Sequence, residues 1–296
     1  MPRILNVIHA DRPSPIGWER EKRRRPHIYH ITGDVHYLAL ALEGARTLLT
    51  IHDCVSLERL RGLKRAVFRL SWYDAPICRA AIVSVVSEST RCELLRHVNC
   101  DAAKVRVIHN CVGDEFVPRP KAFNASEPLL LQVGTGQTKN LERVVAAIAG
   151  LRCRFKIIGR LNRNQLELLN ECGVRYSNVA QASDAELLQA YQECDLVMFA
   201  STYEGFGLPI VEGNATGRPV LTSNVLSMPE VAGAAACLVN PFDAGAIRAG
   251  VLKVLRDAAY RNSLIEAGFE NAKRFSAKRI AAQYAALYRE IAAQGR

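Results

Sequence analysis

STYEGFGLPIVEGN, residues 201–214, follows the β-rich run 195–199 and leads into a segment of helical character. Gly205 and Gly207 allow the backbone to approach a ligand closely. Pro209 suits the first turn of a helix, where the N–H groups have no partners inside the helix and can bind an anion. The segment therefore predicts a strand, a glycine turn and a helix N-terminus that binds a phosphate.

Two glutamates bracket this turn. Glu204 precedes the glycines, and Glu212 lies eight residues later, which is a little over two helical turns. The spacing predicts that the two carboxylates face one site without touching each other, one addressing a sugar and the other a ribose. The alternative is a solvated surface glutamate beside a routine helix start.

The second half of the chain alternates β-rich runs with segments of helical period, a pattern typical of a parallel sheet covered by helices. Ser183 and Glu186 form a capping-box pair, and Asp243 is placed to cap a later helix. A closing helix near 276–293 carries an apolar stripe that must dock on another element. The predicted strands are 129–133, 154–158, 195–199 and 219–222.

The first half is interpreted as a second, smaller α/β unit. Two prolines and the lack of any regular period make residues 113–127 the best linker. We therefore expect domains at 1–118 and 126–275, followed by the closing helix at 276–296. The predicted elements of the first half are strands at 28–31, 47–51, 82–86 and 105–108, and helices around 35–44, 58–72 and 88–97.

Composition excludes several classes of protein. The 296 residues are 49% hydrophobic and 23% charged, and no stretch approaches the ~18 consecutive apolar residues of a membrane span. Nine scattered cysteines contain no C-x-x-C pair, which indicates reduced thiols in the cytoplasm. Neither the cysteines nor the seven histidines form a ligand cluster, so no metal is expected. The turn GTGQTK at 134–139 lacks the third glycine and the later acidic residue of a dinucleotide fingerprint, which leaves an NAD enzyme poorly supported.

These motifs together resemble retaining GT-B glycosyltransferases of the group 1, or family 4, type. EGFGLPIVE at 204–212 matches that family's E-G-F-G-x-P-x-x-E pattern without departure, and further similar segments are 83–95, 106–112 and 131–145. The resemblance covers roughly residues 27–275. It implies two Rossmann-like domains facing across a cleft, with a shortened N-terminal domain, because residues 1–26 show no strand followed by a glycine-rich loop.

The resemblance also implies a donor site in the C-terminal domain. Lys139 would pair with the diphosphate of a nucleotide-sugar donor, Glu204 would hold hydroxyls of the transferred sugar, and Glu212 would bind the ribose. Thr135 and Thr138 stand where relatives often carry an arginine, so backbone N–H groups must add to the stabilisation of the diphosphate. The implied donor-binding set is Gly134, Thr135, Lys139, Phe206, Gly207, Leu208 and Glu212.

In the N-terminal domain, His52 ends an apolar strand and resembles the family's histidine that approaches the donor sugar. The implied catalytic residues are therefore His52, Glu204 and Lys139. A structural histidine is the alternative for His52, and Thr32 or Asp34 could instead cap the helix at 35–44. The residues expected to line the cleft are His30, Thr32, Asp34, Asp53 and Asn110.

The activity implied is transfer of a sugar, with retention, from a nucleotide diphosphate-sugar to a glycan or lipid-linked acceptor in surface polysaccharide synthesis. The resemblance implies a metal-independent hexosyltransferase without a cofactor, the nucleotide sugar being a substrate. Two alternatives remain open: a non-catalytic glycosyltransferase-like protein with a donor pocket and an incomplete acceptor domain, and a nucleotide-sugar epimerase on the same fold.

The basic surplus of the chain suggests a further partner. Of the net charge of +10, most lies in residues 1–125, which carry 20 basic and 13 acidic side chains. Residues 57–72, LERLRGLKRAVFRLSW, predict a basic amphipathic helix that either lies in an anionic membrane interface or packs its apolar face into the core. We expect a cytoplasmic protein that is peripheral on the inner membrane face and binds no nucleic acid.

Overall fold

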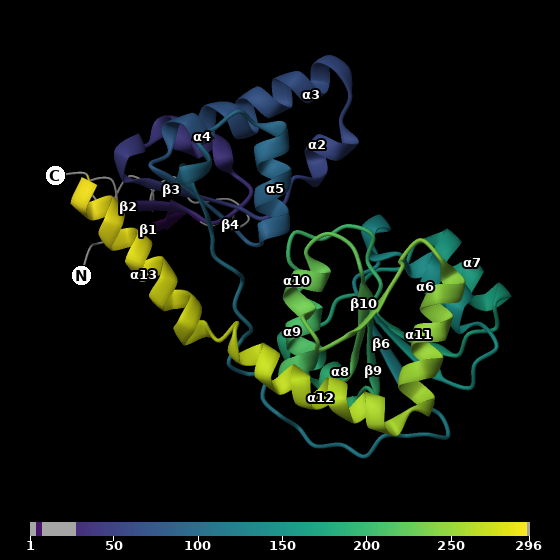
Figure 1. Cartoon of the computed structure of the whole chain (residues 1–296). Helices are drawn as coiled ribbons and strands as arrows, with labels where there is room; N and C mark the ends of the chain where they lie inside the picture. The colour runs from purple at the N-terminus through teal and green to yellow at the C-terminus, as the bar shows by residue number, and fades with distance from the viewer. Residues whose placement is uncertain (1–3, 8–27, 295–296) are drawn as a thin grey trace. The chain divides into compact units, whose positions relative to one another are not determined.

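The computed structural model describes residues 4–7 and 28–294, and the chain divides into two compact units. Unit 1 comprises residues 1–110 and 278–296, and unit 2 comprises residues 111–277 (Figure 1). The division between Asn110 and Cys111 lies just before the segment 113–127 that the sequence marks as a linker.

Unit 1 contains a five-stranded parallel sheet with the strand order β1-β2-β3-β4-β5. The strands are β1 (Ile4–Val7), β2 (Ile28–Ile31), β3 (Thr47–Ile51), β4 (Ile82–Val85) and β5 (Val105–Val107). Strand β1 corrects the expectation that residues 1–26 hold no strand; four residues are too short for a periodic signal. The expected absence of a glycine-rich loop after it falls on residues 8–27, outside the described residues.

The helices of unit 1 differ from the sequence prediction in one region. The single helix expected over 58–72 is wrong, because Leu60 and Arg61 are extended and Gly62 adopts a φ of +57°, which interrupts the helix. The segment at 35–44 is a 3₁₀ helix, His36–Ala41. The helical elements of this region are α2 (Val55–Arg59), α3 (Gly62–Arg69), a π-helical turn (Leu70–Asp74), α4 (Ala75–Arg79) and α5 (Glu88–His97).

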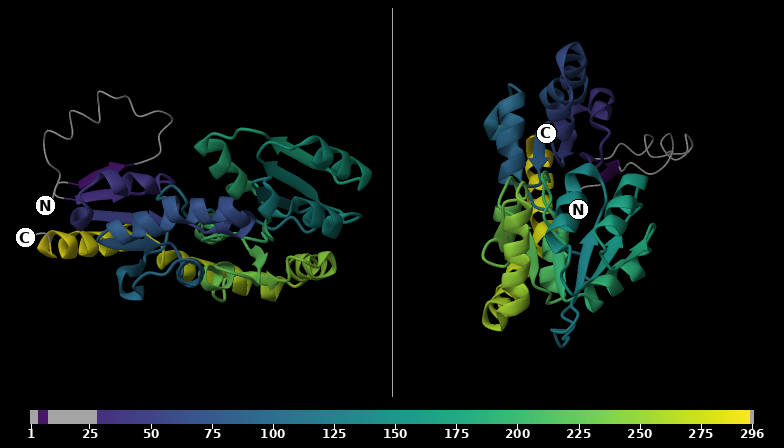
Figure 2. Two further views of the ribbon diagram at one scale, coloured as in Figure 1. Left: turned by 90° about the horizontal axis from the view of Figure 1, so that it is seen from above. Right: turned by 90° about the vertical axis from the view of Figure 1, so that its right-hand side faces the viewer.

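The last helix, α13 (Ala277–Gln294), supplies part of the core of unit 1. Its buried side chains Ile280, Leu287 and Ile291 pack in one cluster with Ile28 and Leu48 of the sheet. Figure 2 shows α13 in yellow beside the purple and blue elements of unit 1. The apolar stripe predicted for this helix is therefore the face that docks.

Unit 2 contains a six-stranded parallel sheet with the order β11-β10-β9-β6-β7-β8. The strands are β6 (Leu129–Val133), β7 (Arg154–Ile158), β8 (Tyr176–Val179), β9 (Leu196–Phe199), β10 (Val220–Ser223) and β11 (Cys237–Val239). Counted along the chain, this is the doubly wound order 3-2-1-4-5-6, whose direction reverses between β6 and β9. Ligands of such sheets bind beyond the carboxyl ends of the strands at this reversal.

Helices surround this sheet, and a buried cluster that includes Leu130, Phe155 and Leu196 forms part of the core. The capping box of Ser183 and Glu186 is present, and Asp243 accepts hydrogen bonds at the start of α11, as the sequence predicts. The helices are α6 (Leu141–Ile148), α7 (Arg163–Glu171), α8 (Asp184–Glu193), α9 (Leu208–Ala215), α10 (Met228–Ala232), α11 (Ala244–Arg256) and α12 (Ala258–Lys273).

Candidate functional site

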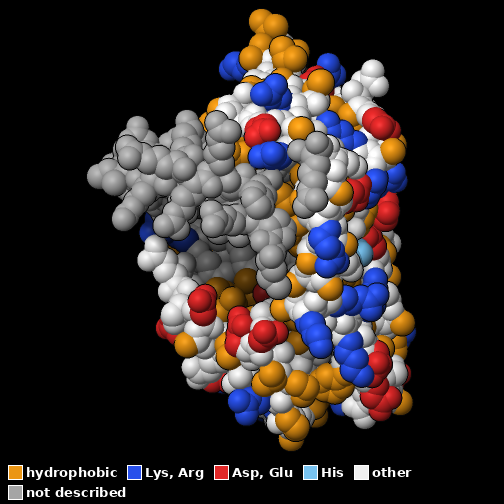
Figure 3. Space-filling model, turned by 90° about the vertical axis from the view of Figure 1, so that its left-hand side faces the viewer, with side chains coloured by type: hydrophobic (Ala, Val, Ile, Leu, Met, Phe, Trp, Pro, Cys, Tyr) orange, Lys and Arg blue, Asp and Glu red, His pale blue; other side chains and the backbone are white. Residues whose placement is uncertain are grey.

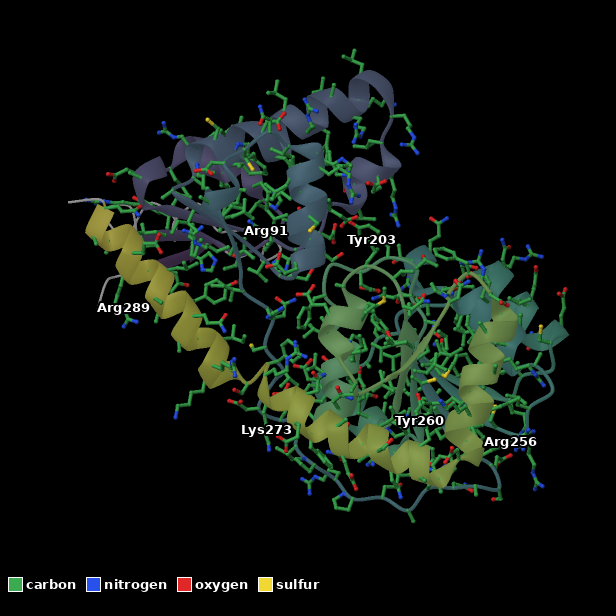
Figure 4. All side chains as sticks on the ribbon, viewed as in Figure 1. Arg91, Tyr203, Arg256, Tyr260, Lys273 and Arg289 are labelled. Carbon is green, nitrogen blue, oxygen red and sulfur yellow. The ribbon has the colours of Figure 1, made fainter. Side chains whose placement is uncertain are left out.

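Two loops of unit 2 meet at the reversal point of the sheet. One follows β6 and the other follows β9, the two neighbouring parallel strands. The loops are joined by a hydrogen bond of 2.8 Å from the Thr202 N–H to the Thr138 carbonyl, and by one from the Asn140 side chain to the Ala200 carbonyl. Figure 4 labels Tyr203 on the second loop, at the end of unit 2 opposite Tyr260 of α12.

The central contact of the site is an ion pair between the two loops. Lys139 Nζ lies 2.7 Å from Glu204 Oε1 and 5.0 Å from the centre of the Phe199 ring. The Lys139 side chain is 27% exposed and that of Glu204 is 16% exposed, so both are accessible in part. A positive and a negative group are thus held together at the place where a doubly wound sheet binds its ligand.

The backbone of the first loop fixes the position of Lys139. Gly134 has a φ of +92°, and a Cβ there would lie 3.0 Å from the Lys139 side chain. Gln132 Nε2 donates to the Lys139 carbonyl, and Asn140 adopts the left-handed conformation. Gln132 and Asn140 are not among the site residues predicted from the sequence, although asparagine is a residue type that tolerates this conformation.

The second loop is fixed at its start and its end. Ser227 Oγ donates to the carbonyls of Glu204 and Phe206, at 2.9 and 3.0 Å. Gly207 has a φ of +108° and stands directly before α9, and no side chain caps that helix. Pro209 occupies its first turn, as predicted. No side-chain cap therefore occupies the N–H groups at the start of α9, the kind of position at which helices bind anions.

The second glutamate lies deeper than the first. Glu212, on α9, accepts a hydrogen bond of 2.5 Å from the hydroxyl of Tyr191, on α8. Burial raises the pKa of Glu212, and the Tyr191 hydrogen bond and the Lys139 charge partly offset that rise. Lys139 thus influences Glu212 electrostatically in addition to its ion pair with Glu204. No local motif of the sequence predicts this contact, because its two residues lie 21 positions apart on different helices.

The other predicted donor residues lie around the same two loops. Thr135 Oγ1 donates to the Arg160 carbonyl at 2.6 Å, so its hydroxyl supports the turn. The Phe206 ring is buried against Phe275, with ring centroids 5.4 Å apart, and Leu208 is 37% exposed at the start of α9. The structure thus brings the whole predicted donor set to one edge of unit 2, with the Phe206 side chain serving the core.

Two buried polar atoms mark the same edge. Among the described residues, Gln132 Oε1 and Ser201 Oγ are the buried side-chain nitrogen or oxygen atoms that make no hydrogen bond. Gln132 lies near the end of β6, and Ser201 follows β9. Buried polar groups are almost always hydrogen-bonded, and exceptions concentrate where function requires them.

In unit 1, the structure brings His52 and Thr32 together. They follow the neighbouring strands β3 and β2, and His52 Nε2 lies 2.7 Å from the Thr32 carbonyl. His52 is exposed at this edge, and Asp53 beside it is half-buried and accepts a hydrogen bond from the Val55 N–H. A histidine and a carboxylate therefore lie where the parallel strands of unit 1 end.

The remaining predicted residues of unit 1 have other surroundings. Asp34 is exposed and accepts a hydrogen bond of 3.0 Å from the indole of Trp72. No side chain caps the 3₁₀ helix His36–Ala41, so the alternative that Thr32 or Asp34 caps a helix there is wrong. Asn110 is half-buried at the end of unit 1.

The prediction that His30 lines a cleft is wrong, because this side chain is buried. It is 3% exposed, and its ring nitrogens lie 2.7 Å from the Tyr288 hydroxyl of α13 and 2.7 Å from Thr50 Oγ1. Thr50 in turn contacts Ser84 Oγ at 2.6 Å. His30 is thus part of a buried polar network between the sheet of unit 1 and its last helix.

This network predicts a pH dependence of stability. The pKa of His30 is lowered from 6.5 to about 4, mainly by burial and also by the charge of His52. The unfolded chain therefore binds more protons between pH 6.5 and 4, so the stabilisation present above pH 6.5 is lost as the pH falls toward 4. The shift corresponds to about 3 kcal/mol. Urea unfolding followed by tryptophan fluorescence reports on unit 1 through Trp72, which packs against a core cluster of that unit.

The control for this prediction is His30→Asn, which keeps a polar side chain without a titrating group. We expect its stability to fall less steeply than that of the unchanged protein over the same pH range. Parallel curves for the two proteins would show that other groups cause the acid sensitivity.

The described residues contain neither a metal-binding cluster nor a membrane-spanning helix. Within residues 4–7 and 28–294, no group of three or more His, Cys, Asp or Glu side chains could hold a metal ion. In the same residues, no helix has both the length and the apolar character needed to cross a membrane.

Comparison with known proteins adds relatives for both units. Residues 114–271, a little more than half of the chain, match the family model of glycosyl transferases group 1, and residues 6–116 match that of Glycosyltransferase Family 4. The chain is 28% identical over 305 residues to O-antigen chain mannosyltransferase B of Escherichia coli, covering 93% of this chain and 77% of that protein. It is also 28% identical to the serotype-specific mannosyltransferase WbdA of Escherichia coli. This match covers 78% of this chain and 32% of that protein.

Solved structures agree on the fold. Sucrose-phosphate synthase from Thermosynechococcus elongatus superposes with a TM-score of 0.78 at 23% identity, over 94% of this chain and 77% of that one. Anabaena HepE in complex with UDP-glucose superposes with a TM-score of 0.75 at 15% identity. This match covers 93% of this chain and 82% of that one. These similarities show two Rossmann-like domains of the GT-B fold. Because the family model matches more than half of the chain, the chain belongs to the glycosyl transferases group 1.

Proposed function

We propose that this protein transfers a sugar from a nucleotide diphosphate-sugar to a glycan or lipid-linked acceptor in surface polysaccharide synthesis, with retention of the anomeric configuration. The observation that carries the proposal is the Lys139–Glu204 ion pair, held beside the uncapped start of α9 at the reversal point of the sheet. A cation and a helix start suit a diphosphate, and a carboxylate suits sugar hydroxyls.

In this mechanism, the bond from the anomeric carbon to the diphosphate oxygen breaks, and a bond to the acceptor hydroxyl oxygen forms on the same face. The acceptor proton passes to the departing diphosphate. Lys139 and the N–H groups of Gly207 and Leu208 stabilise the negative charge that develops on the leaving group. Glu204 exchanges its ion pair for hydrogen bonds to the transferred sugar.

The relatives suggest the sugar to test first. Several similar proteins are mannosyltransferases, including two that act on O-antigen chains by name. We therefore propose a mannosyl nucleotide, with GDP-mannose as the first candidate, and an O-antigen-like acceptor. Neither a metal nor a cofactor is required by this proposal.

The test is a thermal-shift screen with UDP-, GDP-, ADP- and dTDP-sugars, followed by product analysis with the donor that binds. Nucleoside diphosphate release that depends on acceptor, with an unchanged anomeric configuration by NMR, supports the proposal. A changed free sugar without acceptor would indicate the epimerase. Donor binding without transfer to any acceptor would indicate the non-catalytic alternative, and no binding of any nucleotide sugar would refute a donor site.

A second part of the proposal concerns an anionic membrane surface. Helix α3 has no buried residue, and its apolar side chains Leu63 and Val67 are 80% and 58% exposed. Leu70 directly follows and is 61% exposed, so the alternative that this stripe packs into the core is wrong. Lys64 of α3 and Arg61, which directly precedes this helix, are exposed as well. Helix α3 lies at the top of Figure 1. At the top of Figure 3, hydrophobic side chains are drawn with basic side chains beside them.

We propose that α3 inserts its apolar side chains into the interface of an anionic bilayer while its basic side chains contact lipid headgroups. The expected result is that the protein sediments with vesicles containing anionic lipid at low salt and is released at high salt. Reversing Arg61 and Lys64 to glutamate should prevent most of this binding, because each basic side chain near the surface contributes about 1 kcal/mol. Arg65 is left unchanged because it donates to the Leu57 carbonyl and contacts His97.

The matched control reverses two exposed arginines of unit 2, Arg152 and Arg256, which gives the same change in net charge. This variant should still bind the vesicles. If the unchanged protein remains in the supernatant at low salt, or if both variants lose binding equally, α3 is not a membrane-binding element.

A further inference from the structure

We propose that Tyr191 is a positioning residue that holds the Glu212 carboxylate in place for the ribose of the nucleotide. The proposal rests on the proposed function, because it takes Glu212 as a donor-binding group. It starts from one contact: the Tyr191 hydroxyl lies 2.5 Å from Glu212 Oε2, between helices α8 and α9.

Tyr191 is the donor in this hydrogen bond. The side chain is fully buried. The pKa of Tyr191 is raised well above its ordinary value, first by burial and then by the charge and hydrogen bond of Glu212. The phenol therefore keeps its proton, and the carboxylate accepts it in the hydrogen bond.

The protein fixes this tyrosine from several sides. Its ring packs edge-on against Phe116, with centroids 5.5 Å apart. The buried Arg218 donates to the carbonyls of Tyr191 and Gln192 at 2.9 and 2.8 Å, so the end of α8 is held as well. A donor fixed in this way restricts the rotation of the Glu212 carboxylate.

The orientation leaves one carboxylate oxygen for a ligand. Because Oε2 accepts the bond from Tyr191, Oε1 is the oxygen that can accept from a ribose hydroxyl. Tyr191 also acts on the charge of Glu212: burial and Glu115 raise the pKa of this carboxyl, whereas the Tyr191 hydrogen bond and Lys139 lower it. Loss of the hydroxyl therefore moves Glu212 toward the neutral form, which is the poorer acceptor.

The experiment is Tyr191→Phe, which keeps the ring and its packing and removes only the hydroxyl. Binding of UDP and GDP is measured by calorimetry between pH 5 and 8, alongside the 2′,3′-dideoxy forms of both nucleotides. We expect about tenfold weaker binding of the ribose nucleotides, the lower end of the effect of a charge-assisted hydrogen bond. Binding of the dideoxy forms should be unchanged, and the loss should grow as the pH falls.

Three controls separate this role from a structural one. Tyr260→Phe removes a hydroxyl at the other end of unit 2 and should bind as the unchanged protein does. Glu212→Gln should weaken ribose nucleotides specifically. In the double variant, Tyr191→Phe should add little further loss, because the carboxylate that the tyrosine orients is already gone.

The possible results distinguish a failure of the role of Tyr191 from a failure of the proposed donor-binding role of Glu212. If Glu212→Gln weakens ribose nucleotides but Tyr191→Phe binds normally at every pH, the inference is overturned and the donor site stands. If Tyr191→Phe weakens ribose and dideoxy forms equally, its role is structural and the inference also fails. If Glu212→Gln does not distinguish ribose from dideoxy forms, the assignment of Glu212 in the proposed function fails first.

Discussion

Replacing Lys139 with alanine is expected to lower the rate of sugar transfer by roughly a hundred- to a thousandfold. The magnitude is that of removing one preorganised group that stabilises a developing negative charge, about 2.7–4 kcal/mol. Lys139 lies at the reversal point of the sheet, 2.7 Å from Glu204, and its side chain is only partly exposed. The measurement is the initial rate of nucleoside diphosphate release in the presence of acceptor.

The matched control is Lys156→Ala. Lys156 lies on the neighbouring strand β7, and its Nζ is 3.1 Å from Glu193, so this variant also breaks one lysine–glutamate pair of unit 2. It should keep nearly full activity. A Lys139→Ala variant that transfers sugar within threefold of the unchanged protein would falsify the assignment of Lys139 to the leaving group.

The turn and helix start of the candidate site could be predicted from the sequence because their signals are local. Gly207 and Pro209 fix a turn and a helix start within a few residues, and the short apolar run before them fits a buried strand. The β-rich runs of the second half likewise predicted four of the six strands of unit 2. The two missed strands, β8 and β11, are short, and β8 is largely polar.

Contacts between distant segments could not be predicted in this way. The hydroxyl that bonds His30 belongs to Tyr288, 258 residues later in the chain, so no local pattern distinguishes a buried His30 from a cleft histidine. Tyr191 and Glu212 are separated by 21 residues and lie on different helices. In each case the sequence gives the residue type, and only the packing of the helices gives the partner.

The prediction of a single helix over 58–72 is wrong for a local reason, which the apolar period of the segment did not show. Gly62 interrupts the segment with its left-handed conformation, and glycine is the residue type that adopts it at no steric cost. The stripe then continues on a short helix on which Leu63 and Val67 are exposed. Hydrophobic period thus identified the amphipathic face correctly but could not show whether that face meets the core or the solvent.

Replacing Glu204 with glutamine is expected to lower the transfer rate roughly ten- to a hundredfold, the effect of losing one charge-assisted hydrogen bond of about 1.5–3 kcal/mol. The ion pair predicts a second, opposite effect on binding. Because Glu204 competes with the diphosphate for Lys139, the variant should bind a nucleoside diphosphate without a sugar as tightly as the unchanged protein, or more tightly. Transfer kinetics and calorimetry with UDP and GDP measure the two quantities.

The opposite signs make this pair of measurements specific. Lys139→Ala should lose both transfer and diphosphate binding, whereas Glu204→Gln should lose transfer alone. Glu193→Gln, which removes the charge facing Lys156, is the matched control and should change neither quantity. If Glu204→Gln instead weakens the nucleoside diphosphate as strongly as Lys139→Ala does, then Glu204 acts by positioning the lysine, and another group must hold the hydroxyls of the transferred sugar.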